Sequence, residues 1–235
     1  MMKVLLKMMF VCGLVSLADH AALAQTQPPA CPLVGGTFGL LQVSPRTGCP
    51  LSAVIEITNT QTLADGTHVQ TKSKMLVYRD SLGRVRFDNY APEQQAPSFI
   101  QLFDPVEGVR YFIQPQFDVA SRSKWTGPPP SWSVGSTSPS VPKPTVERLE
   151  SQQMEGLLAI GRRTTRTIPA GAEGNDRALT IVSEIWISSD MGITLLEKKS
   201  DPRSGDVEKR MTNLERAEPD AALFQVPADY TIHDQ

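Results

Sequence analysis

The sequence predicts a mainly β protein, one strongly curved antiparallel sheet (half-barrel or barrel) of about nine or ten strands with little helix. Turn signals rich in Asp, Gly and Pro recur roughly every 8–12 residues, with alternating apolar and polar side chains between them. No stretch between residues 25 and 217 sustains a helical spacing of apolar residues. Because large sheets curl or split as strands are added, a flat sheet is not expected. A two-sheet β-sandwich is the alternative.

The first 24 residues have the pattern of a cleaved signal peptide, 1–24. Lys3 and Lys7 flank the start of an apolar run, and Ala22-Leu23-Ala24 supplies the small-x-small pattern of a cleavage site. The apolar run is shorter than the roughly 20 residues of a membrane-spanning helix, so no transmembrane segment is expected after cleavage. An uncleaved N-terminal anchor is the alternative. The sequence therefore predicts an exported protein, periplasmic or extracellular.

Residues 25–50 form a leader rich in Pro and Gly, which contains the two cysteines that remain after signal cleavage, Cys31 and Cys49. Two cysteines in an oxidising compartment are a natural pair, so we expect a disulfide between them. Two free thiols are the alternative. Residues 51–235 are then expected to form a single antiparallel β domain.

A loop rich in Pro, Ser and Gly, 125–144, divides this domain, because its prolines cannot take part in a strand ladder. A mobile linker is the favoured interpretation. In the alternative, Trp125 and Trp132 anchor the loop over an apolar groove.

Two series of strands flank this loop. The expected strands of the first series are 53–60, 68–79, 84–89, 98–103 and 109–113, with 117–124 as a further strand. Those of the second are 145–153, 157–167, 180–188, 193–200 and 206–216. The pair 157–167 and 180–188 is expected to be the central hairpin. Asp220 is positioned to cap one helical turn near the C-terminus.

The sequence contains few residues in the combinations that catalytic sites use. After the signal peptide only His68 and His233 remain, far apart, and no motif for a metal, a cofactor or a nucleophile is found. We expect no enzyme, no metal site and no cofactor; a hydrolase whose site the sequence does not reveal is the alternative. The formal net charge of −2 at pH 7 argues against a nucleic-acid partner.

Apolar side chains on both faces of the expected central hairpin suggest either a doubly buried strand pair or the wall of a ligand groove. The candidate groove residues are Leu158, Ile160, Val182, Trp186 and Leu196. A packed core is the alternative for all of them.

The basic end of 157–167 carries a candidate anion site. Alternation places Arg162 and Arg166 on one face, where two guanidiniums can clamp a carboxylate or phosphate. Salt bridges to acids on neighbouring strands, such as Glu184, are the alternative.

Several stretches are similar to uncharacterised exported bacterial proteins, and the likeness covers roughly residues 70–232. The stretches are Gly161-Arg162-Arg163-Thr164-Thr165-Arg166-Thr167-Ile168-Pro169-Ala170-Gly171, Asn175-Asp176-Arg177, Ser200-Asp201-Pro202-Arg203 and Leu223-Phe224-Gln225-Val226-Pro227-Ala228-Asp229-Tyr230. The strand order with its Leu-Phe…Val-Pro…Tyr ending also resembles the periplasmic lipoprotein carriers and envelope-stress sensors of the LolA, LolB and RseB type. That resemblance implies a half-barrel around an apolar cavity. The Pro/Gly-rich leader stands where those carriers have a long helix.

The sequence thus favours a non-catalytic exported envelope or periplasmic protein that binds an apolar ligand, lipid or lipoprotein in a curved β-sheet. A protein-interaction or sensor module of the cell envelope is the alternative, with another envelope protein as partner.

Overall fold

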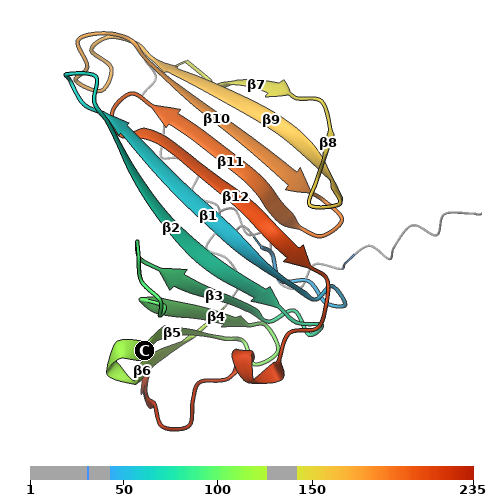
Figure 1. Ribbon diagram of the computed structural model, residues 1–235. Coiled ribbons are helices and arrows are strands. Elements are labelled where there is room, and N and C mark those ends of the chain that lie inside the picture. The colour runs from blue at the N-terminus through green and yellow to red at the C-terminus, as the bar shows by residue number, and fades with distance from the viewer. Residues whose placement is uncertain (1–30, 32–42, 126–141) are drawn as a thin grey trace, which may run out of the picture.

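The computed structural model describes residue 31 and residues 43–125 and 142–235. The expected signal peptide, most of the leader, Trp132 and nearly all of the loop 125–144 lie outside these residues. Thirteen strands of the described residues form a single sheet, mostly antiparallel, with the order β13-β6-β5-β4-β3-β2-β1-β12-β11-β10-β9-β7 and β8 beside β9. No described strand joins β13 to β7, so the sheet is an open half-barrel (Figure 1). The predicted curved sheet is confirmed, and the alternative of two packed sheets is not observed.

The first series of strands forms one half of the sheet (Figure 1). It comprises β1 (Leu51–Thr62), β2 (His68–Arg79), β3 (Val85–Tyr90), β4 (Phe99–Asp104), β5 (Val109–Gln114), the 3-10 turn η1 (Pro115–Phe117) and β6 (Val119–Lys124). Each strand pairs with the next in sequence. The further strand expected at 117–124 begins later, because Asp118 takes a left-handed conformation (φ 53°) at the end of η1.

The second series forms the other half. It comprises β7 (Thr145–Arg148), β8 (Gln152–Met154), β9 (Leu157–Ile168), β10 (Leu179–Ser188), β11 (Ile193–Asp201), β12 (Gly205–Glu215), the 3-10 turn η2 (Ala221–Phe224) and β13 (Thr231–Asp234). Asp220 caps η2 as predicted, accepting a hydrogen bond from the Ala222 amide at 2.9 Å. No described helix has the length and apolar character needed to cross a bilayer.

The two halves join along β1 and β12, which run antiparallel over most of their length. The hairpin β9–β10 is therefore not central, as the sequence suggested, but lies next to the β7 edge. The expected single strand 145–153 is two short strands. Arg148 pairs with Arg162, whereas Gln152 pairs with Ala159, so the register shifts by one residue between β7 and β8.

Buried aspartates shape the tight turns between strands. Asp80 accepts hydrogen bonds from the amides of Leu82 and Arg84, and Asp104 accepts them from Val106 and Glu107, at 2.8–3.1 Å. These carboxylates satisfy amides that the ladder leaves unpaired. This is the physical basis of the Asp-rich turn signals in the sequence.

One large hydrophobic cluster spans both halves. Its fully buried members include Leu51 and Ile55 on β1, Val77 on β2, Ile193 on β11 and Met211 on β12. A smaller cluster of Ile100, Ile113 and Ala120 lies in the first half of the sheet. The strands β1 and β2 bury one face at one end only, and their opposite face carries mostly polar side chains.

Candidate functional site: a polar hollow on the sheet

A hollow of about 630 Å3 opens where β1 and β2 adjoin β10, β11 and β12. It is lined by Thr58, Thr60, Gln70, Lys72, Val182, Glu184, Lys198, Lys199, Ser200, Asp206, Val207 and Glu208. Nearly all of these side chains are polar, and both signs of charge are present. The hollow therefore differs from the mostly apolar pockets that bind small hydrophobic ligands.

Strand register explains why side chains from both halves of the chain share this hollow. Thr58 on β1 lies opposite Glu208 on β12. Glu208 lies opposite Lys198 on β11, which in turn lies opposite Glu184 on β10. Residues directly opposite in antiparallel strands point to the same face of a sheet. Ile55, at an alternate position of β1, points to the other face and is buried in the core.

Ion pairs neutralise part of the charge in the hollow. The Nζ atom of Lys198 lies 3.5 Å from Oε2 of Glu208, and Oε1 of the same carboxylate lies 2.8 Å from Nη2 of Arg210. Glu184 accepts a hydrogen bond of 2.7 Å from Nε of Arg163. These pairs are half-exposed, so they orient the side chains more than they stabilise the fold.

Two charged groups in the hollow form no ion pair with another described residue, namely Lys72 on β2 and Asp206 on β12. Lys72 lies opposite Thr58, and Asp206 lies opposite Thr60, so the two charges flank a pair of hydroxyls. The hollow thus presents a cation, an anion, hydroxyls and the Gln70 amide. Such a set can hydrogen-bond a polar, extended ligand that carries charges of both signs.

No group of three or more His, Cys, Asp or Glu residues in the described parts of the chain could hold a metal ion. His68 and His233 do not meet. His68 lies at the start of β2 beside Thr62 (3.0 Å between Nδ1 and Oγ1), and His233 lies on β13 at the far edge.

The candidate groove residues do not gather in one place. Val182 lines the hollow. Trp186 (9% exposed) and Leu196 (5% exposed) lie opposite one another and belong to the large hydrophobic cluster. Leu158 (52% exposed) and Ile160 (36% exposed) lie at the surface.

The separation of these five residues follows from alternation along β9. Gly161 lies opposite Trp186 and shares its face, and Ala159 shares that face and is fully buried. Leu158 and Ile160 occupy the intervening positions and point to the other side. Runs of apolar residues on β9 therefore reflect one buried face and one exposed apolar face.

The two candidate arginines have different surroundings. Nη2 of Arg166 lies 2.7 Å from Oε1 of Glu173, whose Oε2 also binds Nη1 of Arg203 at 3.0 Å. Arg162 is exposed, lies opposite Ile185 and forms no ion pair with a described residue. Arg166 is thus paired with an acid, whereas among the described residues Arg162 is not.

Arg163, on the opposite face, is the residue that binds Glu184. Its Nη1 also binds Glu147 on β7 at 3.0 Å. The hydrogen bond that Arg163 donates to Glu184, together with the one that it donates to Glu147, raises the pKa of Arg163. The predicted salt bridge to Glu184 thus exists, but it comes from the neighbouring arginine.

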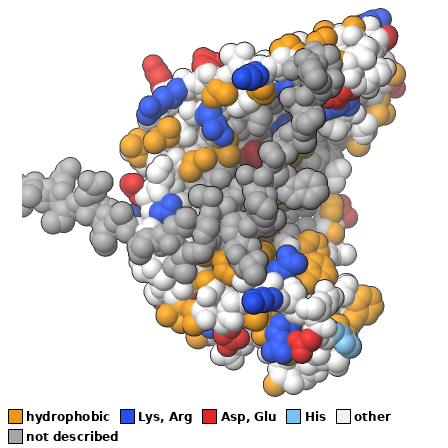
Figure 2. All heavy atoms as spheres, turned by 180° about the vertical axis from the view of Figure 1, so that it is seen from behind, with side chains coloured by type: hydrophobic (Ala, Val, Ile, Leu, Met, Phe, Trp, Pro, Cys, Tyr) orange, Lys and Arg blue, Asp and Glu red, His pale blue; other side chains and the backbone are white. Residues whose placement is uncertain are grey.

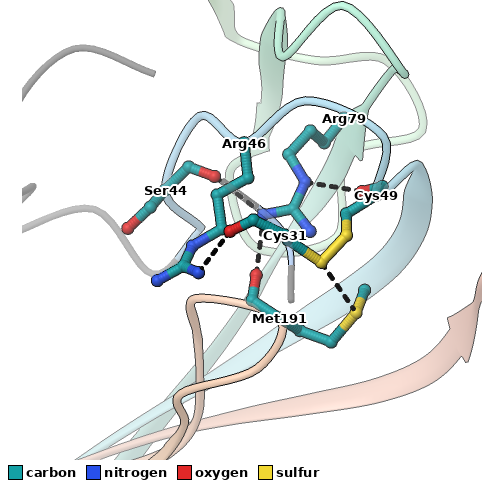
Figure 3. The surroundings of a disulfide bond; sticks show 6 residues. All are labelled: Cys31, Ser44, Arg46, Cys49, Arg79 and Met191. Carbon is teal, nitrogen blue, oxygen red and sulfur yellow. Dashed lines mark hydrogen bonds between the residues drawn. A yellow bond between two sulfur atoms is a disulfide. The ribbon is translucent and has the colours of Figure 1, made fainter. Parts of the chain in front are cut away.

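A buried arginine beside the predicted disulfide is a feature that sequence reasoning missed. Cys31 and Cys49 are joined as predicted, and Figure 3 shows Arg79 next to them. Arg79 is fully buried and donates hydrogen bonds to three backbone carbonyl oxygens: Cys49 (2.7 Å), Ser44 (2.7 Å) and Met191 (2.8 Å). No carboxylate among these partners balances its charge.

Burial, followed by repulsion from Arg46, lowers the pKa of Arg79 to about 9. Arg46 itself donates to the carbonyl oxygen of Cys31 at 2.7 Å. Arg79 thus ties the segment that contains Ser44 and Cys49 to the sheet, and Arg46 ties Cys31 to that segment. A signal existed in the sequence, because Met75, Val77 and Arg79 alternate on one face and place a charge at a core position.

The comparisons with known proteins concern the fold. No family model matches the sequence, and no curated protein does. A solved structure of the MucA/MucB complex of Pseudomonas aeruginosa is similar, with 13% identity and a TM-score of 0.43 over 78% of this chain and 58% of that one. A crystal structure of MucB has 14% identity and a TM-score of 0.42 over 79% of this chain and 60% of that one.

A LolA superfamily protein from Nitrosomonas europaea has 11% identity and a TM-score of 0.37 over 75% of this chain and 90% of that one. Similar solved structures thus include proteins of the LolA type that the sequence resembles. The chain spans less than two thirds of the length of the MucA/MucB and MucB chains that it matches. At these identities and TM-scores, the likenesses do not indicate what this chain binds.

Proposed function

We propose that the mature chain is an exported, non-catalytic binding protein of the cell envelope, periplasmic or extracellular, and that its polar hollow receives an extended segment of a protein partner. The observation that supports this most is the lining of the hollow, where Lys72 and Asp206 flank the hydroxyls of Thr58 and Thr60. The signal-peptide pattern of residues 1–24 supports export.

The chemistry of the hollow favours a polypeptide over an apolar ligand. An extended peptide carries backbone donors and acceptors that hydroxyl and amide side chains can satisfy, and charged side chains that Lys72 and Asp206 can pair with. An acyl chain would instead leave these polar groups without partners, which is unfavourable. The alternative of a protein-interaction module is therefore better supported by this hollow than binding of an apolar ligand.

Site-specific photo-crosslinking in envelope extracts tests the proposal. A crosslinking residue at position 60 lies in the hollow, and one at position 61 lies on the opposite face of the same exposed end of β1. We expect a partner to be captured from position 60 and not from position 61. Combining Lys72→Glu with Asp206→Lys retains net charge but should abolish that capture. Equal crosslinking from both positions, or capture that persists in the doubly reversed variant, would contradict the proposal.

An apolar ligand or lipid is the second candidate, and the exposure of Leu158 and Ile160 favours it. Solvent extraction of the purified mature chain followed by mass spectrometry would detect a bound lipid. A protein that yields no lipid and does not bind fluorescent fatty acids would count against an enclosed apolar site. This outcome is independent of the crosslinking experiment.

A further inference from the structure

A second surface lies on β7, β9 and β10, on the face opposite to the hollow. Its apolar members are Leu158 and Ile160 on β9 and the half-buried Ile185 and Ile187 on β10. Its cations are Arg148 on β7 and Arg162 on β9, both exposed. We call these six residues the basic apolar patch. Viewed from behind, hydrophobic side chains lie beside Lys or Arg side chains over the part of the molecule that holds these strands (Figure 2).

Strand register places the six side chains together. Ile187 lies opposite Ile160, and Arg162 lies opposite both Ile185 on one side and Arg148 on the other. Opposite residues in antiparallel strands hold their Cβ atoms about 5 Å apart. The two guanidiniums therefore project side by side next to the aliphatic side chains.

No acid among the described residues forms an ion pair with either of these two arginines. Glu147 and Glu184, the nearest acids on β7 and β10, point to the other face and bind Arg163. On β11, Glu197 lies opposite Ile185, and its Oε2 lies 3.1 Å from Nζ of Lys209. Like charges directly opposite each other in a sheet are unfavourable, so an anion bound by both would relieve their repulsion.

The shape of the patch favours a broad partner. None of its six residues lines the polar hollow or the two smaller hollows beside β2 and β5, and all six lie on strands at or near the β7 edge. Exposed Leu and Ile side chains beside unpaired arginines match a phospholipid interface, where phosphates lie above acyl chains. An exposed apolar surface of this kind on a soluble protein usually marks an interaction site.

We propose that the basic apolar patch docks the protein on a bilayer that contains anionic phospholipid. Arg148 and Arg162 bind lipid phosphates, and Leu158 and Ile160 enter the interface between headgroups and acyl chains. The polar hollow, on the other face of the sheet, then points away from the bilayer. This proposal does not depend on the proposed function, because the hollow and the patch share no residue.

Sedimentation with phospholipid vesicles tests the proposal on the purified mature chain. We expect binding to vesicles with about 30% phosphatidylglycerol to exceed binding to pure phosphatidylcholine at least tenfold, and to weaken as salt is added. Arg148→Gln with Arg162→Gln should lower the partition coefficient on anionic vesicles about thirtyfold, since each arginine near such a surface contributes on the order of 1 kcal/mol. Leu158→Ser with Ile160→Ser should lower it on the same vesicles.

The matched control combines Phe117→Ser with Arg177→Gln, which removes one exposed apolar side chain and one exposed cation away from the patch. This control should bind vesicles as the unsubstituted chain does. A chain that does not sediment with anionic vesicles, or one that binds equally well to neutral vesicles or after the arginines are replaced, overturns the proposal. Unchanged far-UV circular dichroism and melting temperature exclude misfolding of the variants. Crosslinking from position 60 should be unaffected by the patch substitutions, which separates this proposal from the previous one.

Discussion

The indole of Trp186 on β10 packs directly on Gly161 of β9, so closely that a Cβ atom at position 161 would lie 2.5 Å from the ring. No real Cβ contact is that short, so either the ring or the strand would have to move. This contact places Trp186 in the core rather than in a groove. It also leaves Leu158 and Ile160 on the opposite face.

Replacing Gly161 with Ala should lower the free energy of unfolding by about 1–3 kcal/mol, because the added methyl group overpacks a close contact. Urea unfolding followed by Trp fluorescence measures this. Trp186→Leu should relieve the clash, so the double variant should lose less stability than the sum of the two single changes. Strict additivity would show that the two residues do not interact.

Replacing Arg79 with Met should lower the free energy of unfolding by at least about 3 kcal/mol, because the carbonyl oxygens of Cys49, Ser44 and Met191 lose their donor in a buried site. Met retains the length of the side chain and introduces no charge. Arg177→Met, at an exposed position, is the control and should change stability by less than about 0.5 kcal/mol. An Arg79→Met protein as stable as this control would show that the three hydrogen bonds contribute nothing.

Replacing both Cys31 and Cys49 with Ala should destabilise the protein by about 3 kcal/mol, since the disulfide closes a loop across a sequence separation of 18 residues. Hydrogen exchange should accelerate at residues 43–48, a segment that Arg79 holds against the sheet through the carbonyl oxygen of Ser44. A reducing agent should lower the melting temperature of the unsubstituted chain and leave that of the double variant unchanged. An equal response of both proteins would contradict a stabilising disulfide.

Asp201 should make the free energy of unfolding depend on pH in the acidic range. Hydrogen bonds from Arg203 lower the pKa of this buried carboxyl from 3.8 to about 2. Because its folded pKa lies below the unfolded value, its contribution is present above about pH 4 and is lost as the pH falls through about 2. Asp201→Asn should therefore cost about 1–2 kcal/mol at neutral pH and much less at about pH 2.

Chemical unfolding of both proteins at the two pH values tests this prediction. Asp176→Asn, at an exposed carboxyl, is the control. If the difference between Asp201→Asn and the unsubstituted chain stays the same at both pH values, the carboxylate is not the source of the stabilisation.

Turn chemistry and strand alternation were predictable because they depend on neighbouring residues. Asp80, Asp104 and Asp201 bind amides two to four positions along the chain, and Asp220 caps the turn that follows it. The same holds for most strand limits. The number of strands was harder to predict from the sequence. The register shift between β7 and β8 and the parallel pairing of β13 with β6 depend on which strand of the sheet lies next to each segment.

The candidate site was predictable only in part, because side chains from distant segments meet there. Val182 was expected in a groove and lies in the hollow, but Lys72 and Asp206 reach it only through the pairing of β1 with β2 and β12. Nothing near these residues in the sequence indicates that they share a face. The apolar pattern of β9 likewise did not reveal which of its two faces other segments cover.

Residues 156–187, expected to be the central hairpin, show which features depend on neighbouring residues and which depend on distant ones. Their strands, the turn between them and the alternation of apolar and basic residues follow from local propensity and a period of two. Their place beside the edge, the burial of Trp186 and the exposure of Leu158 follow from contacts between segments far apart in the chain. Such contacts depend on packing of the whole sheet, which local preference does not encode.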